Sequence, residues 1–177
     1  MLFVAYFAAF LFFAVRLFKF YDNKEFIAQY RKFQKNSLVS FSAYYFLIII
    51  YCFIIVRAGG DGNQEINLIP FNVFKVMKAG EYEYEFIFLF FGNIAIFMPL
   101  GVLLPLFIKK KPLIILFPFV LSIGVEVSQY LLKNGQPDID DVILNVIGFF
   151  IGYLMKVLFD KAVFKISKGK LSSVFLL

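Results

Sequence analysis

Several acidic and amide side chains interrupt otherwise apolar stretches of this sequence, where they could do chemistry. Ser122, Glu126 and Gln129 are spaced four and three residues apart, which places them on one stripe of a helix. A carboxyl group inside an apolar stretch is costly to bury and is therefore a candidate functional group. Glu126 could act as a general base in an enzyme, or as a polar anchor in a binding site.

A second polar cluster follows within the next twenty residues. Asp138, Asp140 and Asp141 precede an apolar stretch, and Asn145 lies one helical turn after Asp141. Acidic residues are favoured at a helix N-terminus, so one of these aspartates is expected to be a cap. Three together exceed what a cap requires, and carboxylate oxygens are ligands for Mg²⁺ or Ca²⁺. The sequence leaves both interpretations of Asp138, Asp140 and Asp141 open: helix caps, or a divalent-cation site.

The same stripe continues with Gly148 and Gly152, which form a GxxxG pattern. Small residues at this spacing let a second helix approach closely. We expect this packing to bring Asn145 toward the helix that carries Glu126. Asn93, in a preceding apolar stretch, is the remaining amide that we place in this candidate site.

The composition indicates that these groups lie in an integral membrane protein. Of the 177 residues, 62% are hydrophobic and 17% are charged, with a mean hydropathy of +0.83, whereas soluble domains are about 25% charged. The absence of His and the single Cys52 exclude histidine metal sites and disulfides within the chain. We attribute the net charge of +6 to contact with anionic lipid, and we expect no nucleic-acid partner.

Five apolar stretches are each close to the roughly 20 residues that a transmembrane helix needs. They comprise residues 1–18, 36–56, 86–108, 112–132 and 142–159. We therefore predict an all-α membrane protein, one domain over residues 1–177, built as a bundle of five transmembrane helices. In the long link between the second and third stretches, Pro70 and Gly80 could start and stop a short interfacial or re-entrant helix. A structured loop is the alternative.

The distribution of Lys and Arg predicts the orientation of this bundle. Three connecting segments on one side hold 14 of the 18 basic residues, and the other side holds 4. Basic residues favour the cytoplasm, which predicts an N-out, C-in topology. Glu126 then lies about 9 Å below the outer end of its helix, and Asn93 lies at about 10 Å. Asn145 is in the first turn of its helix, so all three polar groups share a depth on the extracytoplasmic side.

Four motifs in this order resemble the VanZ-like family. They lie within residues 67–153. The first two are N-x-x-P from Asn67 and N-x-x-x-F-x-P-x-G-x-x-x-P from Asn93. The others are S-x-x-x-E-x-x-Q from Ser122 and DIDD-x-x-x-N-x-x-G-x-x-x-GY from Asp138. Members of that family usually carry an Arg shortly before the aspartates, where this chain has none. The resemblance implies a multi-pass cell membrane protein of Gram-positive bacteria, linked to resistance to teicoplanin and related lipoglycopeptides.

Two functions remain open at this point. The first is reduced susceptibility to lipoglycopeptides, through binding of a membrane lipid, a lipid-linked cell-wall precursor or the drug itself. Its site would comprise Asn67, Asn93, Ser122, Gln129, Asp138, Asp141 and Asn145. The second is an intramembrane enzyme that modifies a lipid or lipid-linked glycan, with Glu126 as the base and a divalent cation on the aspartates. No nucleophile is evident, so we favour binding.

Overall fold

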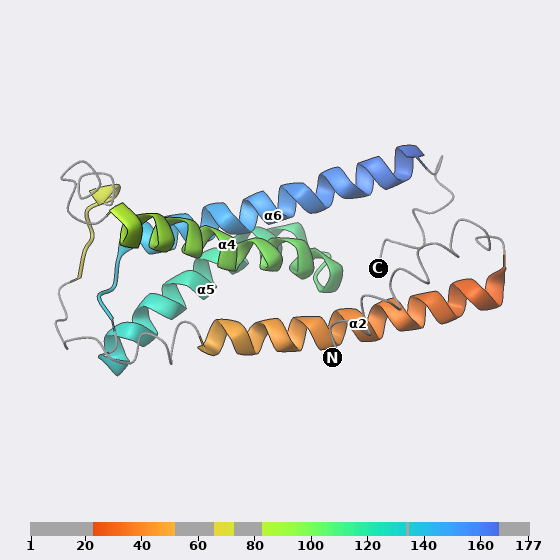
Figure 1. Ribbon diagram of the computed structural model, residues 1–177, viewed down its shortest axis with the longest axis horizontal. Helices are drawn as coiled ribbons and strands as arrows, with labels where there is room; N and C mark the ends of the chain where they lie inside the picture. The colour runs from red at the N-terminus through yellow and green to blue at the C-terminus, as the bar shows by residue number, and fades with distance from the viewer. Residues whose placement is uncertain (1–22, 52–65, 73–82, 134, 167–177) are drawn as a thin grey trace. The chain divides into compact units, whose positions relative to one another are not determined.

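The computed structural model describes residues 23–51, 66–72, 83–133 and 135–166, and most of these residues are helical. The described residues contain four helices: α2 (Lys24–Ile50), α4 (Glu83–Phe107), α5 (Lys111–Leu132) and α6 (Ile139–Ile166) (Figure 1). The extended pairing in these residues is one isolated parallel bridge between Asn67 and Asp138. The prediction of an all-α fold is confirmed at this level.

Three of the described helices are long and apolar enough to cross a membrane. The candidate spans are Phe90–Phe107, Lys111–Leu132 and Ile139–Lys165. They correspond to the last three predicted stretches. The first predicted stretch, residues 1–18, lies outside the described residues, as does most of the predicted interfacial helix, residues 73–82. A five-helix bundle and its orientation therefore remain predictions.

The second predicted stretch, residues 36–56, is described only up to Tyr51, and its helix begins earlier than expected. α2 begins at Lys24 because the side chain of Asn23 caps it, accepting a hydrogen bond from the Phe26 amide at 3.0 Å. The charged residues at 24–35, which we assigned to a connecting segment, are thus helical. α2 is not among the three candidate spans.

The chain divides into two compact units, residues 1–46 with 158–177, and residues 47–157. In the first unit, Tyr30 is fully buried and its hydroxyl accepts a hydrogen bond from Gln34 Nε2 at 2.9 Å. Burial raises the pKa of Tyr30 to about 12, against a smaller lowering by that hydrogen bond. The second unit contains α4, α5, most of α6 and every candidate site residue.

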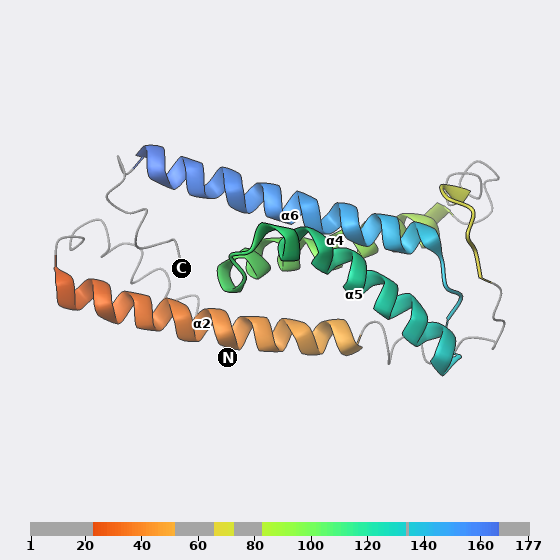
Figure 2. The ribbon, with the colours of Figure 1, turned by 180° about the vertical axis from the view of Figure 1, so that it is seen from behind.

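Within the second unit, α4 and α6 pack with their backbones in close contact. A Cβ atom added at Gly148 would collide with the carbonyl oxygen of Ile94, and one at Gly152 with that of Met98. From the opposite side, a Cβ at Gly101 would collide with the carbonyl oxygen of Phe149. The two helices run side by side in both views (Figures 1 and 2). The GxxxG pattern therefore packs against α4, and not against α5 as we expected.

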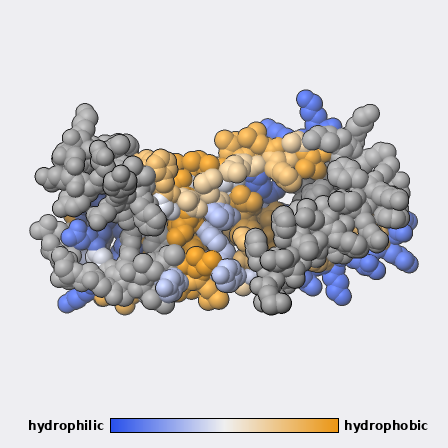
Figure 3. Space-filling view, in the orientation of Figure 1, coloured by the Kyte–Doolittle hydropathy of each residue, from blue (hydrophilic) through white to orange (hydrophobic). Residues whose placement is uncertain are grey.

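The second unit has a small buried core, and many of its apolar side chains lie on its surface. Phe97 of α4 and Phe149 of α6 are fully buried, and Ile114 and Val125 contribute from α5. Many Leu, Ile, Val and Phe side chains on the same helices are exposed. The space-filling view shows apolar surface over the described helices between the grey regions (Figure 3). Such a surface suits helices that face lipid.

Candidate functional site

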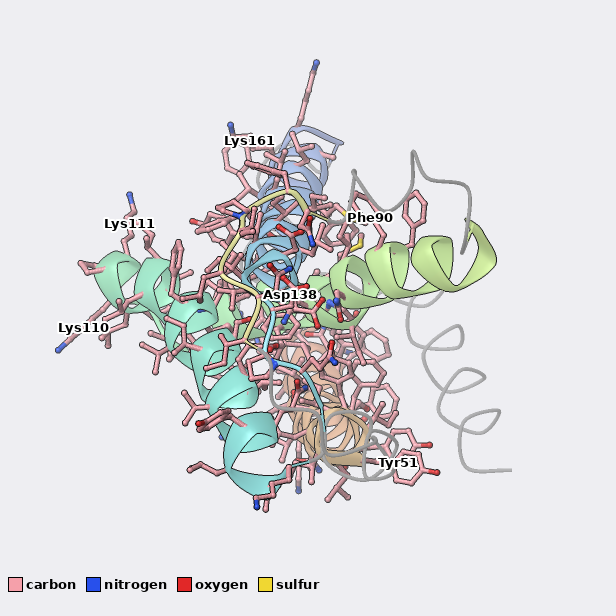
Figure 4. The ribbon with its side chains drawn as sticks, turned by 90° about the vertical axis from the view of Figure 1, so that its left-hand side faces the viewer. Tyr51, Phe90, Lys110, Lys111, Asp138 and Lys161 are labelled. Carbon is pink, nitrogen blue, oxygen red and sulfur yellow. The ribbon has the colours of Figure 1, made fainter. Side chains whose placement is uncertain are left out.

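The candidate site lies where the start of α4, the end of α5 and the start of α6 meet the segment Ile66–Asn72. We call this segment the strap. Asp138 lies near the centre of the view onto this end of the helices, next to the strap (Figure 4).

Asp138 connects three parts of the site. Its Oδ1 accepts a hydrogen bond from the Asp140 amide at 2.8 Å, which makes it the N-cap of α6. Its Oδ2 accepts a hydrogen bond from Asn67 Nδ2 at 3.0 Å. Its own backbone N–H donates to Oε2 of Glu126 at 3.0 Å. Asp138 thus links α6, the strap and α5.

Asn67 ties the strap to the chain just before α6. Its backbone N–H donates to the carbonyl of Pro137 at 2.9 Å, and its own carbonyl accepts from the Ile139 amide at 3.0 Å. Its side-chain Oδ1 accepts a hydrogen bond from the Ile69 amide at 3.1 Å, which folds the strap into a turn. Both the backbone and the side chain of Asn67 are therefore used to position other segments.

Asp140 fixes the other end of the strap. It is only 3% exposed, and its Oδ1 accepts a hydrogen bond from the Phe71 amide at 2.6 Å. Phe71 has a φ of 63°, a left-handed conformation that is unusual for an aromatic residue. Such a conformation costs on the order of 1–3 kcal/mol and persists only where the surroundings hold it in place. The Phe71 amide is a contact that the sequence analysis missed, since no side-chain pattern marks a backbone donor.

Asp141 connects α6 to α4. One of its carboxylate oxygens, Oδ1, accepts a hydrogen bond from Nδ2 of Asn93. Asn93 is buried on α4, ten residues after the start of that helix. We expected Asn93 and the start of α6 to lie at a similar depth. The structure places them in direct contact.

The deeper part of the site joins α5 to α6. Nδ2 of Asn145 donates a hydrogen bond to the Ser122 hydroxyl at 2.9 Å, and both side chains are fully buried. Within the described part of the chain, Oδ1 of Asn145 is buried and accepts no hydrogen bond. A buried polar atom without a partner costs about 1–3 kcal/mol. This oxygen is a position where a donor group of a ligand could bind.

Glu126 and Gln129 complete the stripe on α5. Glu126 is 6% exposed and Gln129 is fully buried. α5 ends just beyond them because Lys133 turns left-handed, with a φ of 53°. Gly135 then lies over Gln129: a Cβ added there would be 3.2 Å from Oε1 of that glutamine. The turn that leads back to α6 therefore covers Gln129.

The predicted site residues thus form one hydrogen-bonded cluster around Asp138 and two separate pairs, Asn93 with Asp141 and Asn145 with Ser122. The three aspartates do not share a common centre. Asp138, Asp140 and Asp141 accept hydrogen bonds from three different segments. Among the described residues, no group of three or more acidic or Cys side chains is placed to hold a metal ion. The geometry supports a helix cap at Asp138 and hydrogen bonds to Asp140 and Asp141 that position the strap and α4. It gives no support to the predicted Mg²⁺ or Ca²⁺ site.

Comparison with known proteins places this network in a family. A family model described as VanZ/LLP1 matches residues 41–160, which is more than half of the chain. The chain belongs to the VanZ/LLP1 family. The matched region contains all of the candidate site residues and the four motifs within residues 67–153.

One relative in this family is Protein VanZ of Enterococcus faecium. It is 38% identical over 91 residues, which cover 50% of this chain and 50% of that protein. The match thus spans about half the length of this relative. No solved structure matches the chain. The family membership and the three apolar helices together identify a membrane protein of the VanZ type.

Proposed function

We propose that this VanZ-family protein reduces susceptibility to lipoglycopeptides such as teicoplanin by binding an amphiphile at its polar site. The amphiphile would be a membrane lipid, a lipid-linked cell-wall precursor or the drug. The family membership supports the link to resistance, as a resistance-type membrane protein.

The observation that carries the proposal is the placement of a buried polar network at the end of apolar helices. Carboxylates and amides from α4, α5, α6 and the strap are connected within a few ångströms. The surfaces of the same helices are apolar and exposed. A molecule with a polar headgroup and an apolar chain would find partners for both parts, since amides supply donors and acceptors together.

The chemistry of the network favours binding over catalysis. Oε2 of Glu126 accepts the Asp138 amide, a contact that positions the start of α6. Asp138 and Asp140 hold the strap, and Asp141 holds α4. The polar side chains that we place in the site are acceptors and amides, which recognise hydroxyl, amine or amide groups. Such groups are abundant on glycan and peptide headgroups.

The proposal is tested by replacing Glu126 in a lipoglycopeptide susceptibility assay. We expect overexpression of the parent protein in a susceptible Gram-positive host to raise the inhibitory concentration of teicoplanin. Glu126→Gln keeps an oxygen that can accept the Asp138 amide but removes the charge. We expect this variant to reach the membrane in normal amounts and to keep most of the protection, whereas Glu126→Ala, which removes the acceptor of the Asp138 amide, should lose it.

Glu25→Gln is the matched control, because Glu25 is an exposed carboxyl at the start of α2. It should protect as well as the parent protein. Immunoblots of isolated membranes check that all variants are present at equal levels. If Glu126→Leu protects as well as the parent does, the polar site is not where the protein acts, and the proposal is wrong.

A further inference from the structure

The strap exposes an apolar face although it lies directly beside the polar network. Its sequence, INLIPFN, contains no charged residue. The side chain of Asn67 turns inward to Asp138. Four large apolar side chains of the strap are more than half exposed: Ile66 at 51%, Leu68 at 71%, Ile69 at 57% and Phe71 at 58%.

Hydrogen bonds hold this face outward. The backbone of Asn67 is bonded on both sides to the chain at Pro137 and Ile139, and the Phe71 amide is bonded to Asp140. The strap therefore cannot rotate its apolar side chains inward without breaking these bonds. The left-handed backbone of Phe71 is a further sign that the conformation is imposed by its attachments.

The position of the strap indicates what covers this face. The residues that hold it form the start of α6, which is a candidate membrane span. The preceding span, α5, ends with Leu131 and Leu132, which are 71% and 56% exposed. The apolar face of the strap thus lies at the same end of the spans as these lipid-facing leucines. Removal of such side chains from water is favourable, so exposure of four of them to water would be unfavourable.

We propose that the strap is a membrane-binding element that inserts Ile66, Leu68, Ile69 and Phe71 into the lipid leaflet. This leaflet is the one that holds the C-terminal end of α5 and the N-terminal end of α6. The strap then lies at the boundary between headgroups and acyl chains, as amphipathic interfacial segments do. Its inward side, through Asn67 and the Phe71 amide, holds the carboxylates at headgroup depth. This inference concerns lipid contact alone and does not depend on the proposed resistance function.

Tryptophan fluorescence tests the insertion, because the chain contains no Trp. The probe is Leu68→Trp, purified and reconstituted in phosphatidylcholine vesicles with or without bromine on the acyl chains. Val120→Trp is the control for full lipid contact, since Val120 is 60% exposed in the middle of α5. Gln136→Trp is the control for water contact, since Gln136 is exposed in the turn before α6. Circular dichroism confirms that each variant keeps the helical content of the parent.

We expect brominated lipid to quench Leu68→Trp at least about half as strongly as it quenches Val120→Trp. Iodide on both sides of the membrane should quench Gln136→Trp and have little effect on Leu68→Trp. If Leu68→Trp is instead open to iodide and insensitive to brominated lipid, the strap does not insert, and a protein partner becomes the better explanation for its apolar face. Ile69→Trp, at a position 57% exposed, replaces the probe if Leu68→Trp is not recovered folded. Because the assay measures no drug susceptibility, its failure is distinct from a failure of the proposed function.

Discussion

Asp138, Asp140 and Asp141 lie within one helical turn, yet each accepts a hydrogen bond from a different residue of the strap or of α4. Asp138 caps α6 and binds Asn67, Asp140 binds the Phe71 amide, and Asp141 binds Asn93. Three acidic residues at a helix start are more than a cap requires. The structure accounts for the excess, because the other two position the strap and α4.

Asp140 should contribute to stability through its hydrogen-bonding oxygen. Asp140→Ala removes the charged acceptor of the part-buried Phe71 amide, and hydrogen bonds to charged groups are worth about 1.5–3 kcal/mol. We expect a lower midpoint of thermal unfolding, followed by circular dichroism in detergent. Asp140→Asn is the matched control, since an amide oxygen can still accept the bond and the midpoint should fall much less. If the midpoint falls equally in the two variants, the charge of Asp140 stabilises this site and the hydrogen bond to the strap does not.

Close packing of α4 and α6 depends on glycines at three positions. Gly101, Gly148 and Gly152 have no room for a Cβ, because backbone atoms of the facing helix occupy that space. The sequence marked Gly148 and Gly152 by their spacing. The sequence did not show that Gly101 faces these two glycines or that α4 is the partner helix. The spacing of small residues on one helix does not identify the helix that packs against it.

Gly152→Ala should therefore destabilise the protein. The added methyl group would meet the carbonyl oxygen of Met98, which is backbone and cannot move aside as a flexible side chain can. Overpacking of this kind costs about 1–3 kcal/mol. Gly124→Ala, on α5, is the matched control, since nothing lies within 4 Å of its added Cβ. We expect a lower thermal midpoint for Gly152→Ala and an unchanged or slightly raised one for Gly124→Ala, because Ala is the better helix former. A neutral Gly152→Ala would contradict the observed packing.

The helices were predicted best where the sequence marks both of their ends. α5 was expected at residues 112–132 and is observed at Lys111–Leu132. A proline near its start and lysines before it mark the boundary. The start of α2 was missed by twelve residues. Its first turns are charged, and the apolar pattern used to find spans does not detect a helix that begins outside an apolar stretch.

The candidate site was predicted in its residues but not in its connections. The expected common depth of Asn93, Glu126 and Asn145 in the membrane stays a prediction, and the structure places these residues on α4, α5 and α6. The Asn145 to Ser122 contact is consistent with the expected approach of Asn145 to α5. The contacts through the Phe71 amide and the Pro137 carbonyl could not be predicted, since every residue except proline has such a donor and every residue has such an acceptor.

At the scale of the whole molecule, the second unit places the polar network at one end of its three candidate spans. Hydrogen bonds join the start of α6 to the early part of α4 and to the later part of α5. α4 and α6 therefore run in the same direction, and α5 runs in the opposite one. The network, the turn at Gly135 and the strap must then lie on the same side of a membrane that these helices cross.

The count of basic residues predicts which side this is. With 14 of the 18 Lys and Arg in segments assigned to the cytoplasm, the network should face the extracytoplasmic side. We expect single cysteines at position 62 or 135, introduced with Cys52→Ala, to react with an impermeant maleimide on intact cells. Cysteines at position 32, which is exposed on α2, or at position 168 should react only after the membrane is permeabilised, which serves as the control for their reactivity.

The labelling result also decides whether a drug or wall precursor outside the cell can reach the site. Position 135 belongs to the turn that covers Gln129, so its accessibility reports directly on the end of the molecule where the network lies. Labelling at 135 from outside, with none at 32 or 168, is the outcome expected of N-out, C-in topology. The reverse pattern would place Glu126, Asp138 and the strap at the cytoplasmic leaflet. Binding of an extracellular lipoglycopeptide at this network would then be ruled out, while insertion of the strap into lipid would still hold.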